Sequence, residues 1–102
     1  DFASAESNYR EILKRDPENL VALNNLAWIL APKPQTAEEA LSFVEKGIRK
    51  LGPIADLLDT RARIYISLGK HEEATQDLNE ALNQGQTSIR YFHLALAKWK
   101  QG

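Results

Sequence analysis

A helix opening recurs in this chain, and this repetition narrows the folds that the chain can adopt. The segments TAEEALSFVEKGI, from Thr36, and GKHEEATQDLNEAL, from Gly69, each place an acidic pair before small or apolar residues. These residues follow at the three- and four-residue steps of one helix face. The matched pairs are Ala40 and Ala74, Val44 and Leu78, Gly47 and Ala81, and Ile48 and Leu82. A constant spacing of about 34 residues is typical of proteins that stack helical hairpins.

The rest of the chain also has the pattern of helices joined by short turns. Its apolar faces are interrupted at Asp16-Pro17, Pro32, Pro34, Gly52-Pro53, Gly69 and Gly85. Proline in a helix interior removes a backbone hydrogen bond, and glycine favours helix ends. Thr36 and Glu39 have the spacing of a capping box, and Asp16 suits the N-cap of the next helix. We expect six helices of roughly 12–16 residues and no sheet, because no segment of the sequence alternates with period two.

The alternate helices repeat at nearly the same spacing. Leu23, Ala27 and Leu30 of one such helix correspond to Leu58, Ala62 and Tyr65 of the next. Leu58, Ala62 and Gly69 in turn correspond to Tyr91, Ala95 and Gly102. The opening segment matches the Thr36 segment, with Ala5, Tyr9, Ile12 and Leu13 in the corresponding places. Both kinds of helix stay in register, and the small differences in spacing fall in the turns, so the chain reads as a repeat array.

The pattern resembles the tetratricopeptide repeat. It is carried by Leu26-Ala27, Leu30, Ala40, Val44 and Gly47 in one unit, and by Leu58, Ala62, Tyr65, Gly69, Ala74, Leu78 and Ala81 in the next. The resemblance implies an all-α fold, a right-handed superhelical array of antiparallel helix hairpins. Small residues such as Ala27, Ala62 and Ala95 are expected to let the two helices of a hairpin approach closely. Arg61 and Lys98 depart from the family pattern, which usually has a large apolar and an aromatic residue there.

The alignment divides the chain into one continuous array. Residues 1–17 form the second helix of a truncated repeat, 18–53 and 54–87 form two repeats, and 88–102 form the first helix of another truncated repeat. This division indicates a section of a larger repeat protein. Each end helix then has an apolar stripe without a partner in the chain, with Phe2, Tyr9 and Leu13 at one end and Tyr91 and Leu94 at the other. These stripes are candidates for end-to-end contact between molecules, the alternative being that the ends fray.

The resemblance also implies that the first helix of each hairpin lines a concave surface. Counting from Ala27, Ala62 and Ala95, the candidate binding residues are Asn24, Asn25, Trp28, Asp59, Arg63, Phe92 and Leu96. Aromatic anchors beside a few polar groups are typical of a peptide groove. Two alternatives remain open. The apolar members can pack between hairpins, and Asp59 with Arg63 can form an i,i+4 salt bridge on a solvated face.

One subgroup of the resembled family binds the C-terminal carboxylate of chaperones through a Lys and Asn pair on the first groove helix. The corresponding positions here are Asn24 and Trp28, and the next helix brings Asp59. A carboxylate at Asp59 is expected to repel such a ligand. The chain therefore does not resemble a co-chaperone clamp.

Composition and motifs give no sign of a reaction. Lysine and arginine total 13 against 14 acidic residues, so the net charge of −1 attracts neither nucleic acid nor an anionic membrane. The sequence has no cysteine, and His71 and His93 lack metal-ligand spacing. Glu38-Glu39 and Glu72-Glu73 lie in first helical turns, where the helix dipole favours acid. We expect no metal, no cofactor and no enzyme activity.

The predicted function is that of a protein–protein interaction or scaffold module that binds a peptide or a partner protein. The alternative is a structural spacer or a segment that assembles end to end. A domain accessory to an enzyme elsewhere in a larger protein would still have binding as its own role. The sequence indicates neither the partner nor the compartment.

Overall fold

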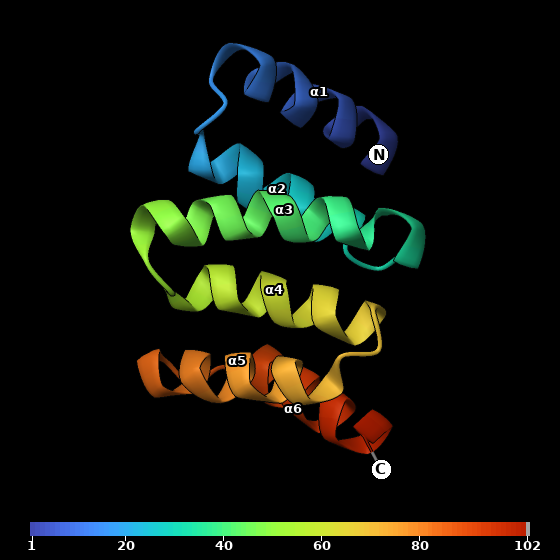
Figure 1. Ribbon diagram of the computed structural model, residues 1–102, viewed down its shortest axis with the longest axis vertical. Coiled ribbons are helices and arrows are strands. Elements are labelled where there is room, and N and C mark those ends of the chain that lie inside the picture. The colour runs from blue at the N-terminus through green and yellow to red at the C-terminus, as the bar shows by residue number, and fades with distance from the viewer. Residues whose placement is uncertain (102) are drawn as a thin grey trace.

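The computed structural model describes residues 1–101, apart from the side chain of Phe2. This part of the chain forms six α-helices: α1 (Phe2–Arg15), α2 (Leu20–Leu30), α3 (Pro34–Leu51), α4 (Ala55–Ser67), α5 (His71–Gln84) and α6 (Ser88–Gln101). They stack along the long axis of a molecule that measures 41 × 26 × 21 Å, with α1 at one end and α5 and α6 at the other (Figure 1). Over these residues, the expected all-α array of hairpins is confirmed.

Contacts between helices follow two patterns. Each helix packs on the next one in the chain, so that α2 with α3 and α4 with α5 form hairpins. In addition, α2 contacts α4, and α4 contacts α6. The first helices α2, α4 and α6 therefore form a continuous row, which we call the first-helix row. In Figure 1, α3 lies in front of α2, and α5 lies in front of α6.

Small residues set the distance between the paired helices. Ala27 of α2 and Ala40 of α3 are completely buried, as are Ala62 of α4 and Ala74 of α5. A methyl group added to Gly47 of α3 would lie 3.2 Å from the side chain of Leu57, so glycine permits the close approach of α3 and α4. Because the helices approach closely at these small side chains, larger neighbours pack together in two cores. Leu26 and Val44 lie in the first core, and Leu78 lies in the second.

Two alanines of α6 differ in their burial. Ala97 packs in the second core with Ala62, Ala74 and Leu78, and it takes the place that Ile64 of α4 takes in the first core. Ala95, which aligns with Ala62, is exposed. Within the described residues, the close helix approach expected at Ala95 is therefore not formed.

An ion pair occupies part of the second hairpin where apolar residues were expected. Nε of Arg61 on α4 donates to Oδ2 of Asp77 on α5 at 2.8 Å, and Nη2 of Arg61 donates to Oδ1 of Asp77 at 2.8 Å. Its guanidinium also lies 5.6 Å from the centre of the Tyr65 ring. The departure of Arg61 from the family pattern is thus accommodated by a paired carboxylate on the facing helix.

Two predicted helix caps are wrong. Helix α2 begins at Leu20 and is capped by Asn19, whose side chain accepts a hydrogen bond from the Ala22 amide, so Asp16 is not the cap. Helix α3 begins at Pro34, two residues before the predicted cap Thr36, because proline suits a first helical position. The Thr36 hydroxyl instead donates to the carbonyl of Leu30 at 2.7 Å, which fastens the turn between α2 and α3.

Candidate functional site

A cation and an aromatic ring meet in the first-helix row. The guanidinium of Arg63 on α4 lies 3.9 Å from the centre of the Trp28 ring on α2. A cation–π contact of this kind contributes about 0.5–2 kcal/mol, depending on how far it is desolvated. Burial lowers the pKa of Arg63 from its ordinary value, although arginine stays protonated at neutral pH. The contact joins neighbouring hairpins and fixes the tryptophan ring.

Two further rings extend this contact onto α6. The ring centre of His93 lies 6.1 Å from that of Trp28 and 5.7 Å from that of Phe92. Burial first, and Arg63 second, lower the pKa of His93 from its ordinary value, while Asp59 acts in the opposite direction. Phe92 is 61% exposed. We call Trp28, Arg63, Phe92 and His93 the aromatic cluster, to which α2, α4 and α6 each contribute.

Asp59 is held by a residue that sequence reasoning missed. Nε of Arg90 on α6 lies 2.8 and 3.0 Å from the two carboxylate oxygens of Asp59 on α4. Burial raises the pKa of Asp59, and Arg90 opposes that effect. The alternative of an Asp59–Arg63 salt bridge is wrong, because Arg90 takes the carboxylate and Arg63 lies on Trp28. The repulsion expected from Asp59 is accordingly offset by a paired arginine.

The two candidate asparagines link helices. Oδ1 of Asn24 accepts a hydrogen bond of 2.7 Å from the Thr60 hydroxyl, which joins α2 to α4. Nδ2 of Asn25 donates to the Tyr9 hydroxyl at 3.1 Å, which joins α2 to α1. Leu96, the remaining candidate, is half-buried on α6. The structure thus brings Trp28, Arg63 and Phe92 together, whereas Asn24, Asn25 and Asp59 connect elements of the fold.

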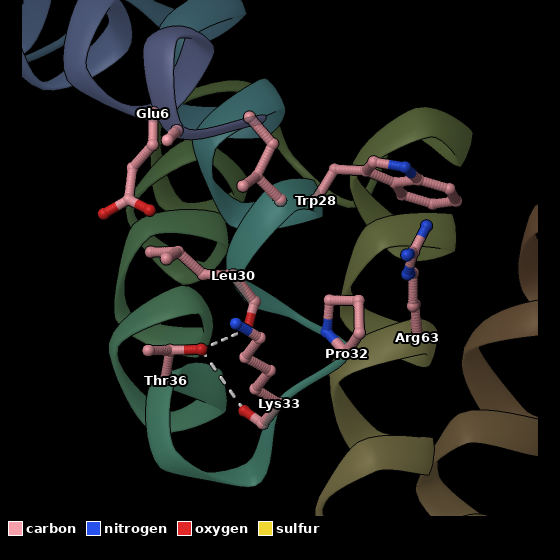
Figure 2. A pocket seen from close by; sticks show the side chains of 9 residues that line it. Glu6, Trp28, Leu30, Pro32, Lys33, Thr36 and Arg63 are labelled. Carbon is pink, nitrogen blue, oxygen red and sulfur yellow. Dashed lines mark hydrogen bonds between the residues drawn. The ribbon is translucent and has the colours of Figure 1, made fainter. Parts of the chain in front are cut away.

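A pocket of about 410 Å³ lies beside the Trp28–Arg63 contact (Figure 2). It is lined by Ala3, Glu6, Trp28, Ile29, Leu30, Pro32, Lys33, Thr36 and Arg63. Figure 2 shows Glu6 and Thr36 on one side and Trp28 and Arg63 on the other, with Pro32 and Lys33 in the turn between α2 and α3. Sequence reasoning missed the pocket because its lining comes from four helices and a turn.

The predicted end stripes differ from one another. Tyr9 and Leu13 are half-buried and pack against the first core, and the side chain of Phe2 lies outside the described part of the structure. On α6, Leu94 packs against the second core, while Tyr91 is 49% exposed. Among the described members of the predicted stripes, Tyr91 is therefore the exposed one.

Searches for other kinds of site give two findings. Within residues 1–101, no three His, Cys, Asp or Glu side chains gather where they can hold a metal ion. Over the same residues, every helix is too short or too polar to cross a membrane.

Two curated proteins are similar to this chain. Tetratricopeptide repeat protein 12 of Mus musculus is 33% identical over 103 residues, a match that covers 94% of this chain and 14% of that protein. A TPR repeat-containing protein of Pseudomonas aeruginosa is 33% identical over 85 residues, covering 82% of this chain and 14% of that protein. No family model matches the chain. The chain spans only a small part of the length of both relatives.

Proposed function

Because the chain belongs to the tetratricopeptide repeat family, we propose that it is a non-enzymatic module that binds a peptide or partner protein on its concave face. The first-helix row lines this face, and the array is a section of a larger repeat protein. The observation that carries the proposal is the aromatic cluster. Trp28 of α2 contacts both Arg63 of α4 and His93 of α6, and His93 in turn lies beside its chain neighbour Phe92.

The chemistry of this cluster suits a peptide ligand. Aromatic and arginine side chains supply most of the binding energy at protein interfaces, because they bury large areas and also form directed contacts. Trp28 is held in place by Arg63 before any ligand arrives, which reduces the entropy lost on binding. Phe92, at 61% exposure, offers apolar surface for a partner to cover.

Selection from a displayed random-peptide library tests this proposal. We expect peptides that bind the native chain to lose about tenfold or more in affinity for Phe92→Ala, as for a central aromatic anchor. The matched control is Trp99→Ala, which removes an aromatic side chain, 77% exposed, from the same helix but outside the cluster. Equal binding by both variants and the native chain would move the site elsewhere. A library without any binder would contradict peptide capture.

A second candidate function is end-to-end assembly. Tyr91 aligns with Leu58 and is 49% exposed, whereas Leu58 is 1% exposed. The face of α6 that carries Tyr91 corresponds to a covered face of α4. On α6 this face is open to a further helix. Sedimentation over a concentration series separates the candidates, since open-ended assembly gives a mass that rises without a plateau and that Tyr91→Glu reduces. A constant monomer mass would exclude assembly.

A further inference from the structure

The pocket beside Trp28 combines apolar walls with charge. Ile29 and Pro32 are apolar members of its lining, and Glu6, Lys33 and Arg63 are its charged members. A ligand that fills it must therefore present both an apolar group and a group that satisfies the local charge.

Glu6, the acidic residue of the lining, already has a cationic partner, which it shares with Glu39. Nε of Arg10 lies 3.0 Å from a carboxylate oxygen of Glu6, and the same guanidinium places its two terminal nitrogens 3.0 Å from the oxygens of Glu39. By contrast, among the ion pairs of the described residues, neither Lys33 nor Arg63 has an acidic partner. The charge left without a partner in the pocket is therefore positive.

Arg63 is positioned to accept an anion. Its guanidinium lies 3.9 Å from the centre of the Trp28 ring, and a guanidinium has five N–H donors, so this contact leaves donors that can pair with a carboxylate. Arg63 is half-buried, and a buried cation without an anion is unfavourable, as the lowered pKa of Arg63 also indicates. Asp59, one turn earlier on α4, is held by Arg90.

The position of Arg63 favours a carboxylate within a chain over one at its end. Trp28 and Arg63 line the pocket, and Trp28 also contacts His93, whose ring neighbours Phe92. A peptide that crosses this point has the pocket on one side of Arg63 and the rings of α6 on the other. An acidic residue inside the peptide has a peptide residue on each side of it, so that one can face the pocket and the other the rings of α6.

We propose that the pocket binds an internal Asp or Glu side chain of a partner peptide, with the carboxylate paired to Arg63 and with Lys33 adding to the positive charge of the lining. An adjacent apolar side chain of the peptide packs against Ile29 and Pro32. This inference rests on the proposed function, since it names the chemistry of the ligand for the same surface.

Fluorescence titration of a Trp99→Phe chain tests the inference, because Trp28 is then the one tryptophan of two that remains. The probes are two libraries of nonapeptides with acetylated N-termini and amidated C-termini, identical except for Glu or Gln fixed at the centre. We expect the Glu library to bind about tenfold more tightly, as charge-assisted hydrogen bonds provide. The preference should shrink as salt rises.

Charge variants assign the preference to the pocket. Arg63→Gln should abolish the preference for Glu, Arg63→Lys should retain part of it, and Lys33→Gln should reduce it. Arg49→Gln, which removes an exposed charge on α3, is the matched control and should leave it unchanged. Thermal melts establish that each variant is folded.

Each contrary outcome has a distinct meaning. Equal binding of the Glu and Gln libraries, with Phe92→Ala still weakening both, overturns the acidic ligand and leaves the proposed function standing. Binding only by the same nonapeptides made with a free C-terminus, used as a third probe, overturns the internal carboxylate. A chain that binds neither library overturns the inference together with the proposed peptide site.

Discussion

Asp59 of α4 and Arg90 of α6 are joined by a largely buried salt bridge in which the arginine Nε lies 2.8 and 3.0 Å from the two carboxylate oxygens. The side chains are 17% and 10% exposed. The guanidinium also donates to the Gly85 carbonyl, in the turn that leads into α6. This single arginine therefore links α6 both to the preceding first helix, α4, and to the turn between α5 and α6.

Removal of either partner of this salt bridge should destabilise the fold. We expect Asp59→Ala or Arg90→Ala to cost about 2–4 kcal/mol. Arg90→Ala leaves the largely buried Asp59 carboxylate without its cation, and Asp59→Ala leaves Arg90 with only the exposed Asp56 carboxylate, 3.4 Å away. Urea unfolding measures both variants and their double mutant. The double mutant should lose clearly less than the sum of the single losses, because the two residues interact. Additive losses would show that the two side chains act independently.

The ion pair of Arg61 and Asp77 replaces an apolar pair of the previous hairpin. The matching residues are Leu26 and Phe43, which pack in the first core. We expect Arg61→Leu alone, or Asp77→Phe alone, to cost about 2–4 kcal/mol, because one buried charge is left. The combined substitution should restore stability to within about 1 kcal/mol of the native chain, since apolar pairs often replace ion pairs without loss. Thermal melts that rank the double variant lowest would refute this.

The burial of the alanines predicts which positions tolerate a larger side chain. Ala62 and Ala97 are completely buried, and Ala95 is exposed. Leucine at either buried position should cost about 1–3 kcal/mol through overpacking. Leucine at Ala95 should change the free energy of unfolding by less than about 0.5 kcal/mol, as at other surface positions. A large loss at Ala95 would show that this face is covered in solution.

His93 should make stability depend on pH. Its pKa is lowered in the folded state by burial and by Arg63, so the unfolded chain binds the proton first as pH falls through about 6.5. The free energy of unfolding should therefore fall between neutral pH and the folded-state pKa, and His93→Gln should remove this part of the dependence. In NMR titrations, Arg63→Gln should move the pKa of His93 upward. A shift in the opposite direction would contradict the contribution of Arg63.

The repeat spacing predicts the architecture because apolar and small residues occupy matched places. Ala27, Ala40, Ala62 and Ala74 all lie in helix contacts, as their alignment predicts. The helix caps were harder to predict from the sequence. Asp16 and Asn19 are both good capping residues, and only the position of the turn selects Asn19. Pro34 likewise suits either a helix stop or a first turn.

The candidate site was only partly predictable for a different reason. Alignment to the alanines identified Trp28 and Arg63, which do lie together. It did not identify Arg90, which aligns with Leu57, an apolar residue of the previous first helix. Repeat spacing predicts where the backbone of a residue lies. It does not predict which residue of another helix a long charged side chain will pair with. The pocket was missed because the turn containing Pro32 and Lys33 has no counterpart in the helix pattern.

The aromatic cluster links binding to the mechanics of the array. Trp28 is contacted by Arg63 from the next first helix and by His93 from the one after that, so the cluster is intact only while three successive layers stay in register. Repeat arrays flex and unravel from their ends, because each layer holds only its neighbours. A ligand bound to Trp28, Arg63 and Phe92 would contact three successive first helices and connect them along the array. It would resist bending and delay fraying of the last helix, so that recognition and stiffness would change together.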